Sequence, residues 1–133
     1  MSVNSRLILK QVEVTDLNNG RYRFAVFIGC EEEEYVGEVI SPDTDDNQLS
    51  AVAQATLYSL GKFLPQSVKL RLDQSGQVTF ASKAMFFVVV EVIEGLSLQL
   101  LSGTCLFTTV TLDVAAKAIL DAMNRKVEKY TVK

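Results

Sequence analysis

The chain consists of two similar halves, and each half ends in an alanine-rich segment with helical spacing of its apolar residues. Residues 49–57 recur 63 positions later as residues 112–120, with a leucine at both ends and two alanines inside in common. An apolar stretch precedes each segment at a nearly constant distance, at residues 24–28 and 86–90. Such self-similarity indicates two packed copies of one supersecondary unit. It constrains the architecture and leaves the chemistry open.

Each half is predicted to contain three strands followed by one helix, because alternating apolar residues give way to helical spacing. In the first half the expected strands are 7–14, 21–28 and 35–40, and the helix is 47–64. In the second half the expected strands are 68–80, with a turn or bulge at 74–76, 84–93 and 96–107. The second helix is expected to follow Thr111, which caps it, and to carry Asp113 in its first turn. The predicted fold class is α+β: a duplicated βββα-βββα unit, an antiparallel sheet with two helices packed on one face. One domain is expected over 1–133, with pseudo-repeats at about 6–65 and 67–130.

Residues 84–93 are almost wholly apolar, so both faces of this strand should be covered. We expect the side chains of the run 88–90, together with Ile119 and Leu120, to be buried. Two helices can easily cover only one face of a sheet. A second copy stacked across the other face would cover the remainder, so the sequence predicts a homodimer.

Composition excludes several classes of partner. The formal net charge is −3, whereas a surface that follows phosphates needs excess lysine and arginine, so nucleic-acid binding is disfavoured. The longest apolar run, 84–90, is too short to cross a bilayer, and no membrane partner is expected. The first six residues lack an apolar signal core, so a cytoplasmic location is the default expectation.

No catalytic residue, metal or cofactor is expected. The chain contains no histidine, which removes the commonest general base, and Ser-His and Cys-His pairs with it. Cys30 and Cys105 occupy different places in the two halves and are expected to be small, half-buried, reduced residues, with a redox pair as the alternative. The acidic run at 31–34 is expected to be a solvated loop, because adjacent carboxylates diverge and calcium sites need spaced ligands.

The last helix carries a resemblance to a known family. Residues 116–125 combine small side chains with a closing Ala122-x-Asn124 pattern, and this segment looks like the last helix of the regulatory domain of 2-isopropylmalate synthase. That domain also consists of two βββα units, so the similarity of order extends over essentially the whole chain. The resemblance implies a pseudo-symmetric module that dimerises and binds a small amino acid between its halves. The family's catalytic barrel is absent, so the synthase reaction is not implied.

The expected ligand site lies where the return strands meet the helix N-termini, near Gly37, Asp45, Gly103, Thr104 and Asp113. Glycine allows close backbone approach, and unpaired helix N–H groups offer donors to a carboxylate. The aspartates suit an ammonium group, and an amino acid carries both charges; a small organic acid is the other ligand considered.

Three classes of function follow. The first is a non-catalytic regulatory module that senses a small ligand. The second is a dimeric interaction or scaffold domain without a ligand. The third is an enzyme that uses a carboxylate in a cleft between protomers.

Overall fold

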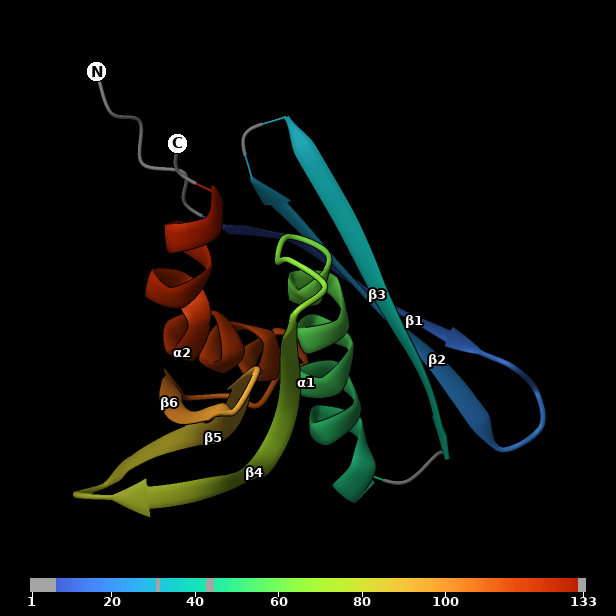
Figure 1. Cartoon of the computed structure of the whole chain (residues 1–133). Helices are drawn as coiled ribbons and strands as arrows, with labels where there is room; N and C mark the ends of the chain where they lie inside the picture. Colours follow the sequence, from blue (N-terminus) through green and yellow to red (C-terminus); the bar gives the residue numbers. More distant parts are fainter. Residues whose placement is uncertain (1–6, 31, 43–44, 132–133) are drawn as a thin grey trace.

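The computed structural model describes residues 7–30, 32–42 and 45–131. The elements follow in the order β1 (Ile8–Asp16), β2 (Arg21–Cys30), β3 (Glu33–Pro42), α1 (Asp45–Gly61), β4 (Val68–Phe80), β5 (Lys83–Glu94), β6 (Ser97–Phe107) and α2 (Asp113–Thr131). The predicted α+β class and the βββα-βββα order are confirmed (Figure 1).

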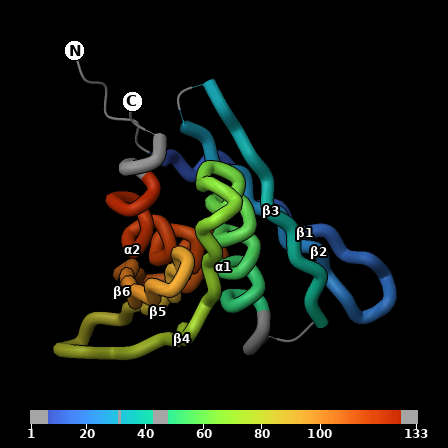
Figure 2. The backbone as a smooth tube through the Cα atoms, viewed as in Figure 1, coloured from blue at the N-terminus to red at the C-terminus, as the bar shows by residue number. Residues whose placement is uncertain are grey.

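The strands form two separate three-stranded antiparallel sheets, one in each half, where one sheet with both helices on one face was expected. Their orders are β1-β2-β3 and β4-β5-β6, so β2 and β5 are the central strands. Helix α1 packs on β2 and β3, helix α2 packs on β5 and β6, and the two helices also contact each other. The helices therefore lie between the two sheets, as both views of the backbone show (Figures 1 and 2). Contacts of α1 with β4, and of α2 with β1, join the two halves further.

The core is formed by the inner faces of both sheets and the facing sides of both helices. On β2, Phe24, Val26 and Ile28 are fully buried, because alternate residues of a strand point to the same face. Val88 and Val90 of β5 are equally buried against α2. These strands sit at nearly the same distance from their helices along the chain, so the repeat seen in the sequence is a repeat of core packing.

Each sheet has one glycine on which its helix rests. A Cβ atom added to Gly37 would lie 2.1 Å from the carbonyl oxygen of Ala55, and one added to Gly103 would lie 2.3 Å from the carbonyl oxygen of Ala118. The two helix residues are 63 positions apart, so the contact belongs to the repeat. Small residues on both sides explain how helix and strand backbones approach so closely.

The structure differs from several local predictions. Val89 was expected to be buried with Val88 and Val90, but it is only half-buried because its side chain points to the outer face of the sheet, which this chain leaves uncovered. Helix α1 ends at Gly61 instead of residue 64; the next three residues form turn-type bonds, such as Phe63 N–H to the Leu60 carbonyl at 2.9 Å. The expected break at 74–76 is a bulge between Leu72 and Gln74, and β4 continues through it.

The acidic run was expected to be a loop. Glu33 and Glu34 instead open β3, where Glu33 pairs with Cys30, and residue 31 lies outside the described part of the chain. Within the residues that the structure describes, no helix combines the length and the apolar character needed to span a bilayer.

Candidate functional site

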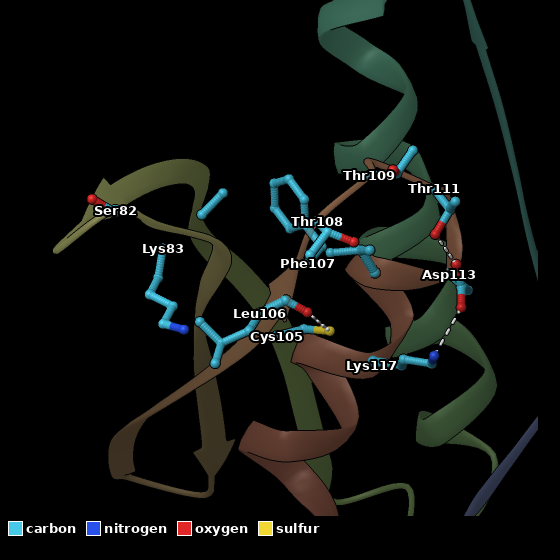
Figure 3. A pocket seen from close by; sticks show the side chains of 12 residues that line it. Ser82, Lys83, Cys105, Leu106, Phe107, Thr108, Thr109, Thr111, Asp113 and Lys117 are labelled. Atoms are coloured by element: carbon cyan, nitrogen blue, oxygen red, sulfur yellow. Dashed lines mark hydrogen bonds and ion pairs between the residues drawn. The ribbon is translucent and has the colours of Figure 1, made fainter.

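A surface groove lies where the last strand leads into α2. It has a volume of about 720 Å³ and is open to solvent. One wall comes from the β4–β5 hairpin and the other from the start of α2, with the end of β6 and the following loop between them (Figure 3). We call it the α2 groove; it is lined by Ser82, Lys83, Ala84, Cys105, Leu106, Phe107, Thr108, Thr109, Thr111, Asp113, Val114 and Lys117.

Asp113 and Lys117 form the charged pair of this groove. They stand one helical turn apart, and Lys117 Nζ lies 3.0 Å from Asp113 Oδ2. The hydroxyl of Thr111 donates a hydrogen bond to the other carboxylate oxygen of Asp113. Asp113 is therefore held from two sides, and about two fifths of its side chain remains exposed, at 38%.

The helix start differs from the expected cap. Thr111 was expected to cap α2 with its side chain, but its hydroxyl bonds to the Asp113 carboxylate and its backbone carbonyl accepts the N–H of Val114 at 3.2 Å. The N–H of Ala115 bonds to the carbonyl of Leu112 at 3.3 Å. These two N–H groups already have partners, so a ligand in the groove would meet side chains more than backbone donors.

Asp113 and Lys117 each favour the ionised form of the other. The hydrogen bonds from Thr111 and Lys117 hold the pKa of Asp113 below its ordinary value, and the Asp113 carboxylate raises the pKa of Lys117. Both groups are ionised at neutral pH. The groove therefore presents a fixed carboxylate and a fixed ammonium group side by side.

Cys105 contributes a half-buried thiol to the same wall. Burial raises its pKa, and Asp113 and Asp121 raise it further against the opposing effect of Lys117. The thiol is thus protonated at neutral pH, and its Sγ donates a weak hydrogen bond to the Leu106 carbonyl at 3.5 Å. Cys30 lies buried in the other sheet, and neither cysteine is in a disulfide bond.

A second groove also borders Asp113 and Lys117. It has a volume of about 680 Å³ and lies between β1 and the start of α2, where Leu9, Lys10, Gln11 and Val12 face Thr111, Leu112, Asp113 and Lys117. Asp113 and Lys117 therefore border two grooves. The second of these joins the two halves of the molecule.

The five predicted site residues do not come together. Gly37 and Gly103 lie in different sheets, each beneath its own helix, with no space beside them for a ligand. The N–H of Thr104 is occupied by Asp121 Oδ2 at 2.9 Å. Asp45 is the first residue of α1, and its side chain lies outside the described part of the chain. Asp113 alone borders the α2 groove.

Sequence reasoning missed Lys83, Cys105, Thr109 and Lys117 as groove residues. Lys117 carried a readable signal, because it follows Asp113 by four residues on a predicted helix. Lys83 and Cys105 come together at the groove through the pairing of β5 with β6, in which Ala84 lies opposite Phe107, and Thr109 lies in the loop between β6 and α2.

Among the described residues, no group of three or more acidic, cysteine or histidine side chains is placed to hold a metal ion. Comparison with models of known protein families gives no match, and comparison with curated proteins gives no significant match.

Proposed function

We propose that this chain is a non-catalytic regulatory module that binds a small amino acid or organic acid in the α2 groove. The observation that supports it best is the Asp113–Lys117 pair, which holds one negative and one positive group within a groove of about 720 Å³. Small-ligand sites have volumes of about 300–1,000 Å³, with a few placed polar groups on apolar walls. An amino acid's ammonium group suits Asp113, and its carboxylate suits Lys117 and the neighbouring threonine hydroxyls.

The chemistry of the groove favours binding over catalysis. A carboxylate with a lowered pKa is a weak base, and a thiol with a raised pKa is a weak nucleophile at neutral pH. Lys117 is kept protonated by Asp113, so it does not supply a free amine. Each ionisable group of the pair is therefore tuned to keep a charge.

A regulatory role follows from where the pair lies. Asp113 and Lys117 also border the groove against β1, the first strand of the other half. A ligand that rearranges this pair would change contacts between the two halves. The module would then report ligand binding to a protein that contacts either half.

Isothermal titration calorimetry with the branched-chain and small amino acids tests this proposal. We expect heat of binding for at least one of them at millimolar concentration. Asp113→Asn and Lys117→Met should each weaken that binding at least tenfold. Arg125→Met is the matched control, because Arg125 is exposed on the same helix two turns beyond Lys117 and should leave binding unchanged. Absence of any binding, or equal loss in the control variant, would refute the proposal.

A second candidate function is a dimeric interaction domain that works without a small ligand. It is favoured by a different observation, the apolar outer face of the β4–β6 sheet, on which Leu98 and Leu106 are 62% and 60% exposed. A thermal-shift screen separates the two candidates, because only a ligand that binds the native state raises its stability.

A further inference from the structure

The outer face of the β4–β6 sheet is unusually apolar for an exposed surface. Side chains alternate along β5, so Met85, Phe87 and Val89 point away from α2 while their neighbours form the core. On β6, the exposed Leu98, Leu100 and Leu106 share this outer face, since each lies opposite an outward residue of β5. We call this surface the B face.

Apolar side chains continue to the tip of the β4–β5 hairpin. Val78 lies opposite Met85 in the register, and it is 43% exposed. Phe80, at the end of β4, is 72% exposed. A contiguous exposed apolar surface of this kind marks an interaction site.

The central charges of the B face are satisfied within the chain. Arg71 Nη2 lies 2.6 Å from Glu91 Oε1, and the Glu91 side chain is only 12% exposed. This pair leaves no uncompensated charge at the centre that would select an oppositely charged partner or repel an identical face. Two lysines lie at the ends of the face: Lys69, the second residue of β4, is opposite Ile93, and Lys83, the first residue of β5, is opposite Phe80.

The corresponding outer face of the first sheet is different. It carries Arg23 on β2, with Glu13, Glu34 and Glu38 on the flanking strands, and the Lys10 side chain lies over Gly29. These charges lie among apolar side chains such as Ile8 and Ile40, each 53% exposed, so this face is mixed. The two halves share a fold, but their outer faces differ in the number of charged side chains.

The free edge of the B face on β6 has no protecting device within its own strand, although the N–H of Thr104 is bonded to Asp121 Oδ2. Strand β1 has a bulge between Leu9 and Gln11, β4 has one between Leu72 and Gln74, and β3 ends at Pro42. Bulges, prolines and charges are the usual devices that keep sheet edges from pairing. Strand β6 has no bulge in its pairing with β5, no proline and no charged residue over its 11 residues. On this strand the outward Leu98, Leu100 and Leu106 lie on either side of Ser102 and Thr104.

We infer that the B face binds the B face of a second copy of this chain across a two-fold axis. Strands of 11 to 13 residues make a sheet about 40 Å long, and three strands make it about 14 Å wide. Two such faces cover about 1,100 Å² in flat projection, which reaches the area of about 1,000 Å² that a specific interface needs. A two-fold contact of identical apolar faces needs no charge complementarity, and the lysines of this face lie at its ends and not at its centre. The carboxylates Glu13, Glu34 and Glu38 lie on the opposite sheet, away from the contact.

Sedimentation equilibrium at micromolar concentration tests this inference. The wild-type chain should have twice the mass of one chain. Leu100→Glu, which places a charge at a position 57% exposed in the single chain, should keep the far-UV circular dichroism of the wild type and raise the dissociation constant at least 100-fold. Leu98→Lys should do the same with the opposite charge, so the effect does not depend on net charge.

Ile40→Glu is the matched control, because Ile40 is 53% exposed on the outer face of the other sheet. It should remain dimeric. A wild-type mass of one chain, or dissociation caused by Ile40→Glu and not by Leu100→Glu, would overturn the inference. The inference does not rest on ligand binding in the α2 groove: a monomer that binds an amino acid would refute the dimer and leave the proposed function standing.

Discussion

Replacement of Gly103 by alanine should destabilise the protein strongly, although it adds a single methyl group. The new Cβ atom would lie 2.3 Å from the carbonyl oxygen of Ala118, 2.5 Å from the backbone nitrogen of Ala122 and 2.8 Å from the Cβ atom of Ala122. Two of these three atoms belong to the helix backbone, which cannot turn aside as a side chain can. Helix α2 would have to move about 1 Å away from β6 to restore ordinary contact distances.

The magnitude follows from two opposing contributions. Overpacking of a well-packed core costs about 1–3 kcal/mol, and a clash with backbone belongs at the upper end. The loss of glycine's freedom in the unfolded chain returns about 0.4–1 kcal/mol. We therefore expect a net loss of about 2 kcal/mol in the free energy of unfolding, measured by urea titration.

Two further variants test whether the loss of stability comes from the close contact between strand and helix. Gly37→Ala should lose a similar amount, because its Cβ atom would lie 2.1 Å from the carbonyl oxygen of Ala55. Gly61→Ala, at the end of α1, should be neutral or stabilising by up to about 1 kcal/mol, since nothing lies within 4 Å of the added atom. A change below about 0.5 kcal/mol for Gly103→Ala would refute the close packing of β6 on α2.

Three other predictions concern the core and the α2 groove. Ile119→Ala should cost about 2–5 kcal/mol, because Ile119 is fully buried; a loss below about 0.5 kcal/mol in the same titration would contradict the placement of α2. Ser59→Ala should cost about 0.5–1.5 kcal/mol, because it removes the hydrogen bond that the buried Ser59 hydroxyl donates to the Tyr35 carbonyl at 2.8 Å; a stability equal to the wild type would show that the bond contributes nothing. The pKa of Asp113 is lowered in the folded state, so its contribution to stability is present above its unfolded pKa of about 4 and is lost as the pH falls through the lower folded value. Acid titrations of the wild type and Asp113→Asn should converge below that range, and curves that stay parallel would contradict it.

The repeat, the element order and the central core strands were predictable because they depend on local patterns. The apolar runs 24–28 and 86–90 identify core strands, but a run that is apolar at every position does not show which face is the core. These runs also could not show that the strands divide into two sheets with the helices between them. Val89 shows the consequence: it belongs to an apolar run, but it lies on the outer face of the second sheet, which no other part of this chain covers.

The candidate site was harder to predict than the fold. Glycines 37 and 103 were read as places of close backbone approach, which is correct, but the approaching backbone is that of the helix. Lys83 and Cys105 reach the α2 groove through strand pairing, which brings together segments more than 20 residues apart. Such pairing is set by the whole sheet and has no local signature.

The most direct test of the proposed function is a two-dimensional ¹H–¹⁵N NMR titration of the wild-type chain with the amino acid that gives the largest thermal shift. Binding in the α2 groove predicts that the backbone signals of Thr109, Thr111, Asp113 and Lys117 move most, with smaller changes at Lys83 and Cys105. Signals of the opposite sheet's exposed face, such as that of Ile40, should stay in place. Shifts absent from the groove residues, or concentrated elsewhere, would contradict the account.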